Sequence, residues 1–222
     1  MITGMVPLDT VLHGLGERTT PAAFADLCDT LVWKFTDNGA ELHDLAAVWA
    51  SGDDPSRARA AALITAPPTP VPGDGTVFPP LPATPFPDVL LGLRDRMDLE
   101  DFTSTCDALL WTVSESEVLT TARTWLGSDD PHRIEAALAV NDGLLYATRS
   151  SLAEALTALT TRHPGYAPRA AQILTTYDDH TRPRTLHDAT TGRWTPQALA
   201  DLYLQPVPTI EHWLRTHSRR TD

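Results

Sequence analysis

A duplication constrains the fold of this chain of 222 residues more than any other feature. Two segments, about 20–65 and about 98–145, contain Phe, Cys-Asp, Leu, Trp, a second Trp and Asp-Asp-Pro in the same order. The first part of the match has an offset of 78 residues and the second part an offset of 76, with the two-residue gap near Asn38 and Gly39. Such internal repetition predicts that one supersecondary unit occurs twice.

The residues of each copy predict three helices. In the first helix of copy one the apolar residues recur at helical spacing and form one stripe, which consists of Phe24, Leu27, Cys28, Leu31, Val32 and Phe35. The third helix of each copy follows an Asp-Pro pair, in which the Asp caps free N–H groups and the Pro occupies the first helical position. Since no strand-rich region occurs, the predicted fold is all-α, with a duplicated three-helix unit, a Pro-rich connector and C-terminal helices.

Composition along the chain divides it into four predicted parts. Nine prolines lie between Ala66 and Asp88 and predict an extended connector, because proline removes backbone donors and excludes helix. Two further short segments, Gly14–Gly16 and Thr185–Thr195, are interpreted as a turn and as a short hairpin or arm. The predicted parts are repeat unit 1 (1–65), the connector (66–88), repeat unit 2 with extra helices (89–180) and a C-terminal segment (181–222).

One tryptophan in each copy points away from the apolar stripe. Trp33 lies roughly 180° from the stripe at about 100° per residue, with Asp29 one turn earlier on the same side. Copy two repeats this arrangement with Asp107 and Trp111. These four residues are the candidate surface, with three interpretations left open. The two copies pack together or the connector lies across them and buries both tryptophans, or the tryptophans bind another protein, or they form a ligand site. Cys28 and Cys106 lie on the stripe itself and are expected to be small buried hydrophobes.

Charge and motif content narrow the function classes. Lys and Arg total 17 against 29 Asp and Glu, a net charge of −12, which argues against a chain-wide coat of nucleic acid or anionic lipid. No catalytic motif and no helical His pair with a third ligand occurs, so we expect no enzyme activity, no metal and no cofactor. Two cysteines, no secretory signal and no long apolar run favour a cytoplasmic protein without membrane contact. The Arg-dominated basic residues are typical of a GC-rich bacterial genome.

The C-terminal segment carries a spacing of its own. Ala200 stands ten positions before Ile210 and thirteen before Trp213, an arrangement that lets two helices cross closely over a small residue. This segment, about 195–217, resembles bacterial helix-turn-helix and excisionase-like DNA-binding domains. The resemblance implies that DNA contacts come from Gln205, Val207, Thr209, His212 and Arg215 in the groove and from Arg219 and Arg220 on phosphates.

The second and third helices of each copy, with their Asp-Asp-Pro and Ala-rich run, resemble HEAT-type helical repeats. That resemblance implies a surface for a protein partner. The expected function is therefore that of a non-enzymatic bacterial regulator, whose acidic helical module binds a protein partner or self-associates and whose C-terminal segment contacts DNA. The alternative is a cytoplasmic protein-interaction or scaffold protein that binds no nucleic acid.

Overall fold

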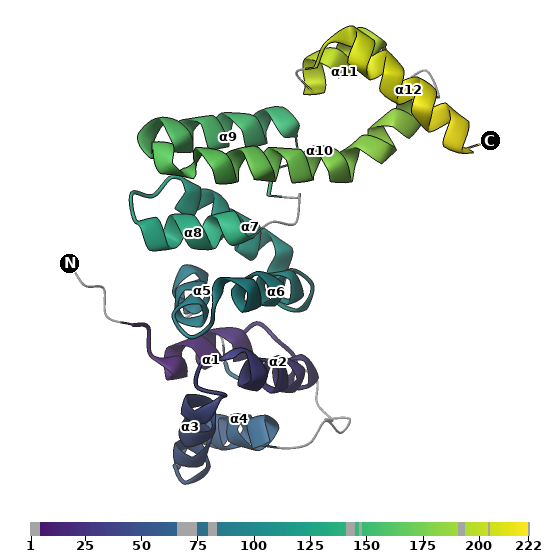
Figure 1. Cartoon of the computed structure of the whole chain (residues 1–222). Coiled ribbons are helices and arrows are strands. Elements are labelled where there is room, and N and C mark those ends of the chain that lie inside the picture. The colour runs from purple at the N-terminus through teal and green to yellow at the C-terminus, as the bar shows by residue number, and fades with distance from the viewer. Residues whose placement is uncertain are drawn as a thin grey trace. The chain divides into compact units, whose positions relative to one another are not determined.

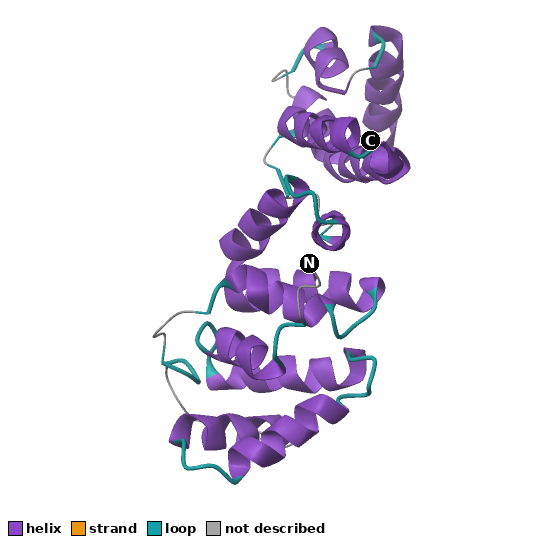
Figure 2. Ribbon diagram, turned by 90° about the vertical axis from the view of Figure 1, so that its left-hand side faces the viewer, coloured by secondary structure: helices purple, strands orange, loops and turns teal. Residues whose placement is uncertain are grey.

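The structure is a computed structural model that describes residues 5–65, 75–79, 84–140, 145–146, 148–190, 194–203 and 205–221. By its internal contacts the chain separates into two compact units, Met1–Val140 (unit 1) and Asn141–Asp222 (unit 2). Every regular element in the described residues is helical and none is a strand, which confirms the predicted all-α fold (Figure 2).

Figure 1 labels the helices. Unit 1 contains α1 (Leu8–Gly16), α2 (Pro21–Lys34), α3 (Ala40–Ala50), α4 (Pro55–Thr65), α5 (Phe86–Arg94), α6 (Leu99–Leu109), the π-helical segment η1 (Leu110–Ser114), α7 (Glu115–Leu126) and α8 (Pro131–Ala139). Unit 2 contains α9 (Arg149–Arg162), the 3₁₀ turn η2 (Pro164–Tyr166), α10 (Ala167–Thr190), α11 (Pro196–Tyr203) and α12 (Val207–Thr221).

Two predicted Asp-Pro starts are helix N-termini in the structure. Asp54 Oδ1 accepts from the backbone N–H of Ser56 at 2.8 Å, and α4 begins at Pro55. Asp130 Oδ1 accepts from the N–H of His132 at 3.0 Å, and α8 begins at Pro131. Each carboxylate satisfies a donor that the helix cannot pair internally, so capping explains this motif without a metal or catalytic role.

The predicted apolar stripe forms the core of unit 1. On α2 the side chains of Phe24 and Cys28 are fully buried and Leu27 and Leu31 are almost so. Phe35, just after α2, is also buried, and Val32 is half-buried. Phe102, Cys106 and Leu109 of α6 are buried in the same way.

Helices α1 and α5 cross closely in the middle of unit 1 (Figure 1). A Cβ atom added to Gly14 of α1 would lie 2.3 Å from Val89 Cγ2, and one added to Gly92 of α5 would lie 2.3 Å from Val11 Cγ2. Each glycine therefore admits a valine of the opposite helix. The prediction of a turn at Gly14–Gly16 is wrong, because these glycines serve close helix packing within the last turns of α1 rather than a bend.

Two arginines link the halves of unit 1 reciprocally. Arg18, after α1, donates to the carbonyl oxygen of Thr84 at 2.8 Å and through Nε to Glu117 of α7 at 3.2 Å. Arg96, after α5, donates to the carbonyl oxygen of Val6 at 2.9 Å and through Nε to Glu41 of α3 at 2.7 Å. Arg18 and Arg96 are 78 residues apart, and so are Val6 and Thr84. The two glutamates, Glu41 and Glu117, are 76 residues apart. These reciprocal contacts agree with the duplication, which stays an interpretation of the sequence.

The helix pairs of unit 1 do not follow chain order. The α1–α2 pair lies between α3–α4 and α5–α6, with α7–α8 on the far side of α5–α6 (Figure 1). A regular solenoid stacks each repeat on its neighbours in the sequence. The HEAT resemblance therefore stays a prediction about the helix pairs alone.

Several predicted boundaries differ from the structure. Helix α5 begins at Phe86, inside the segment 66–88 that was expected to be extended, because Phe86, Val89 and Leu90 are buried. Residues 66–74 and 80–83 of that connector lie outside the described residues. The prediction of a hairpin or arm at 185–195 is wrong for residues 185–190, because they belong to α10. The Thr-Thr-Gly run that indicated a turn begins at Thr190, the last residue of this helix.

Candidate interaction sites

The two outward-facing tryptophans are the most exposed large hydrophobic side chains in the described part of the chain. Trp33 is 81% exposed and Trp111 is 83% exposed. The described residues of the two copies therefore do not bury the tryptophans against one another. Whether the connector covers them stays a prediction, because its residues 66–74 and 80–83 lie outside the described residues. Helical periodicity shows which side of a helix faces away from the core, but it does not show whether another element covers that side.

Different local structures hold the two tryptophans. Trp33 lies in the last turn of α2, after which the chain turns through Asn38 and Gly39 with φ of 56° and 73°. Trp111 lies in η1, where the chain passes from α6 to α7 through a π-helical turn. The two additional residues of copy one thus belong to the left-handed turn. π-helical turns occur frequently at functional sites, which favours a role for the residue that this turn carries.

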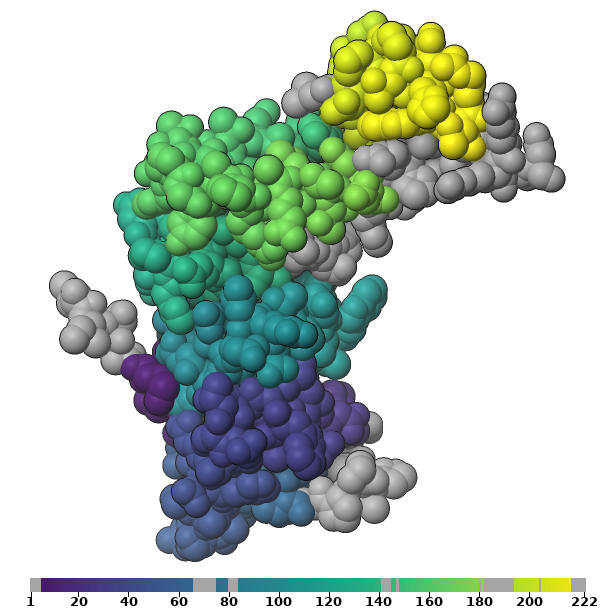
Figure 3. All heavy atoms as spheres, in the orientation of Figure 1, coloured from purple at the N-terminus to yellow at the C-terminus, as the bar shows by residue number. Residues whose placement is uncertain are grey.

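Helices α2 and α6 are linked near the tryptophans. The Lys34 ammonium donates to the hydroxyl of Ser104 on α6. The N–H of Thr36, just after α2, donates to the carbonyl oxygen of Arg96 at 2.8 Å. In Figure 3 the atoms of α2 and of the α6–η1 region both reach the surface on the right-hand side of unit 1.

Acidic side chains accompany both tryptophans. Asp29 and Asp107 are exposed and lie about one helical turn before Trp33 and Trp111. Unit 1 carries eight Lys and Arg against 21 Asp and Glu, a net charge of −13, whereas unit 2 carries nine against eight, a net charge of +1. All of the chain's net negative charge therefore belongs to the unit that exposes the two tryptophans.

The cysteines lie behind this surface as buried thiols. Both Cys28 and Cys106 are free and fully buried, as expected for small hydrophobes. Burial raises the pKa of the Cys28 thiol far above its ordinary value. Burial does the same for the pKa of Cys106, where Asp107 adds to the rise and Lys34 opposes it. Neither thiol is available as a thiolate nucleophile near neutral pH.

The C-terminal segment places the residues of the helix-turn-helix spacing together. Leu199, Ala200, Tyr203 and Ile210 form a buried cluster between α11 and α12, and Trp213 packs against it. The rings of Tyr203 and Trp213 meet edge to face with centroids 5.8 Å apart. The N–H of Gln205 donates to the carbonyl oxygen of Ala200 at 3.0 Å and closes the turn.

The residues proposed for DNA contact divide into three groups. Gln205, His212 and Arg215 are exposed, whereas Val207 and Thr209 are half-buried. Val207 packs partly against the buried cluster, and its place in the groove stays a prediction. Arg219 and Arg220 lie in α12, but their side chains lie outside the described residues. On the exposed face of α12, Glu211 and Arg215 form an ion pair with an N–O distance of 3.9 Å, which reduces the positive charge offered to phosphate.

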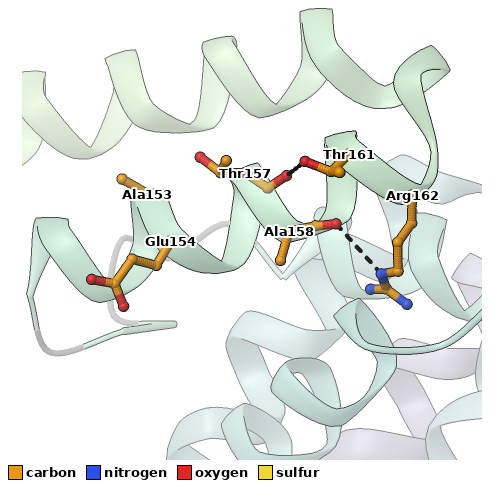
Figure 4. A pocket seen from close by; sticks show the side chains of 6 residues that line it. All are labelled: Ala153, Glu154, Thr157, Ala158, Thr161 and Arg162. Carbon is orange, nitrogen blue, oxygen red and sulfur yellow. Dashed lines mark hydrogen bonds between the residues drawn. The ribbon is translucent and has the colours of Figure 1, made fainter.

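Two hollows lined by described residues present no catalytic pairing among those residues. One, of about 600 Å³, follows a single side of α9 and is lined by Ala153, Glu154, Thr157, Ala158, Thr161 and Arg162 (Figure 4). In it, Thr161 and Arg162 donate to carbonyl oxygens of the same helix. A second, of about 460 Å³, runs along α7 beside Arg18, whose guanidinium is occupied by Glu117 and backbone carbonyls.

The described residues contain neither a cluster of metal ligands nor a membrane-spanning helix. No group of three or more His, Cys, Asp or Glu side chains there is placed to hold a metal ion. No helix in the described ranges is long and apolar enough to cross a membrane. In comparisons with known proteins, no family model, no curated protein and no solved structure matches this chain.

Sequence reasoning missed the part that α1 and α5 play. The run Val-Leu-x-Gly-Leu followed by Arg occurs at 11–18 and again at 89–96, at the same offset of 78 residues. This signal extends the repeated pattern to four helices in each copy, and it contains the glycines and arginines of the reciprocal contacts.

Proposed function

We propose that the chain is a non-enzymatic interaction protein of regulatory type, in which unit 1 binds a protein partner through Trp33 and Trp111. One observation carries this proposal: both tryptophans are about four-fifths exposed at positions that the sequence relates to one another. A pair of large aromatic side chains left outside the core is typical of a contact surface, where Trp is enriched among the residues that dominate binding.

Most of the indole surface of Trp33 and Trp111 is left in water. Burying the exposed part of one such side chain, roughly 150 Å², contributes about 4 kcal/mol at ~25 cal/mol per Å². Folding of unit 1 does not use this contribution, because the core is already filled by the stripe residues on the other side of α2 and α6. A partner that covers both indoles gains this free energy of burial on binding.

Capture of partners from an extract of the source cells tests the proposal. Trp33→Ala/Trp111→Ala in the full chain is expected to lose proteins that the native chain retains, with an unchanged circular dichroism spectrum. Val48→Ala is the matched control, since Val48 is a 65% exposed hydrophobic side chain on another helix of unit 1. If the double variant retains the same proteins as the native chain and the control, the proposal is wrong.

A second candidate function is DNA contact through α11 and α12. The burial of Ala200 and Ile210 in one cluster with Trp213 against it supports this candidate, because helix-turn-helix domains hold their second helix in this manner. The Glu211–Arg215 ion pair and the inward-facing Val207 count against it, so the protein-binding role of unit 1 is the better supported of the two.

Fluorescence anisotropy with a labelled DNA duplex over a range of salt concentrations tests this second candidate. DNA contact predicts an affinity that falls steeply with salt and decreases on Arg215→Ala. Arg162→Ala, which removes an exposed arginine from α9, is the matched control. Absence of binding at low salt, or equal losses for the two variants, would contradict DNA contact by α12.

A further inference from the structure

The contacts between the halves of unit 1 have the pattern of a two-fold symmetric interface. In such an interface the contacts are reciprocal: if residue i of the first half contacts residue j of the second half, then residue j of the first half contacts residue i of the second half. Gly14 meets Val89 while Gly92 meets Val11. The paired arginines behave in the same way. Arg18 reaches α7 and Thr84, two residues before α5, while Arg96 reaches α3 and Val6, two residues before α1.

The two tryptophans occupy equivalent positions in the sequences of the two halves. Trp33 and Trp111 stand 78 residues apart, as do Gly14 and Gly92 and the two arginines. Their exposures differ by only two percentage points, and an exposed aspartate precedes each at the same spacing. Unit 1 therefore presents one kind of surface feature twice.

The two features lie within reach of one partner. Lys34, next to Trp33, contacts Ser104, which precedes Trp111 by seven residues. Seven residues of helix rise about 10 Å. With the lengths of the Lys34 and Ser104 side chains added, the Cα atoms of Trp33 and Trp111 lie within roughly 25 Å of each other. About eight residues of extended chain span that distance.

We propose that the partner carries two equivalent arginine- or lysine-bearing elements and engages both tryptophans at once, one element on each. This inference rests on the proposed function, in which the tryptophans bind protein. A guanidinium or ammonium group stacks on the indole face while the neighbouring carboxylate of Asp29 or Asp107 forms a charge-assisted hydrogen bond with it. The charge of −13 on unit 1 attracts such a partner and repels nucleic acid and anionic membranes.

Isothermal titration calorimetry of the full chain with triarginine, which is too short to span both tryptophans, tests the equivalence of the sites. The expected result is two peptides per chain with one affinity. Trp33→Ala or Trp111→Ala each removes one of the two sites, and the double variant removes both. Val48→Ala keeps both sites. Asp29→Asn and Asp107→Asn each weaken one site several-fold and by similar factors.

A peptide in which two triarginine clusters are joined by a flexible linker of about ten residues tests simultaneous engagement. It is expected to bind one per chain and at least tenfold more tightly than triarginine, because the second contact becomes intramolecular. Either single tryptophan variant abolishes that gain. Binding of only one triarginine, or a linked peptide no tighter than triarginine, would overturn the two-element partner.

Failure of the basic partner and failure of the proposed function give different results. If triarginine and the linked peptide do not bind, or bind the double tryptophan variant as well as the native chain, the basic partner is wrong. The proposed function fails only if protein partners captured from the extract are also retained by that double variant.

Discussion

Replacement of Gly14 by alanine tests the close crossing of α1 and α5. The added Cβ would lie 2.3 Å from Val89 Cγ2 and 3.2 Å from the Cβ of Thr84. The first separation is more than 1 Å below ordinary carbon–carbon contact, which is about 3.5–4.0 Å. Either the helices move apart or Val89 leaves its rotamer, and both changes disturb a buried interface.

The magnitude follows from two opposing effects. Overpacking of a filled interface costs about 1–3 kcal/mol. Alanine instead of glycine in a helix favours the folded state by about 1 kcal/mol. Since a separation of 2.3 Å is a severe overlap, the upper part of the overpacking range applies, about 2–3 kcal/mol, and Gly14→Ala is expected to lower the free energy of unfolding by about 1–2 kcal/mol. Gly92→Ala is expected to lower it by a similar amount, because its Cβ would meet Val11 Cγ2 at the same 2.3 Å.

Urea unfolding monitored by circular dichroism measures both effects. Gly52→Ala is the control, since its Cβ would have no neighbour nearer than 3.7 Å, and no loss is expected there. The double variant Gly14→Ala/Val89→Ala is expected to lose less free energy of unfolding than the sum of the losses of the two single variants. The reason is that Val89→Ala removes the methyl group that clashes with the new Cβ. A Gly14→Ala protein as stable as the native chain, or strict additivity with Val89→Ala, would refute the packing argument.

Three further predictions concern the arginines, the thiols and the tryptophans. Arg96→Met is expected to lower the free energy of unfolding by about 3 kcal/mol. Its loss should be at least as large as that of Arg18→Met, because both arginines satisfy two carbonyl oxygens and a glutamate and Arg96 is the more buried; urea unfolding measures both. Because the pKa of Cys28 is raised on folding, its contribution to stability is complete below pH 9 and falls as pH rises above 9. Unfolding midpoints from pH 8 to 11 are therefore expected to decrease less in Cys28→Ala than in the native chain, and an equal decrease would contradict this. Caesium ions are expected to quench the tryptophan fluorescence more than iodide at low salt, since the exposed indoles lie on the acidic unit, and the difference should disappear in Trp33→Phe/Trp111→Phe.

Local chemistry explains why part of the fold was predictable. The stripe from Phe24 to Phe35 and the Asp-Pro starts of α4 and α8 depend on residues within a few positions of one another. Periodicity and capping therefore predict them from sequence alone. The packing of Ala200 with Ile210 was predictable for a similar reason, since their spacing allows one close helix crossing.

The features that were missed depend on tertiary contacts. Gly14 has the sequence signature of a turn, and only the position of Val89 on a helix far along the chain explains its place inside α1. The exposure of Trp33 depends on whether any other element covers the outer side of α2, which no local pattern records. The partial burial of Val207 likewise depends on the cluster between α11 and α12, which its position in the helix-turn-helix resemblance does not predict.

Fluorine NMR of the full chain labelled with 5-fluorotryptophan tests the central claim most directly, because each of the six tryptophans gives its own resonance. Substitution of Trp33 and of Trp111 assigns two of these resonances. On titration with the linked triarginine peptide, both are expected to shift together with one midpoint, while the resonances of the buried Trp49 and Trp125 stay in place. If the Trp33 and Trp111 resonances do not shift, or if only one of them does, unit 1 does not bind a basic partner through a pair of equivalent tryptophans.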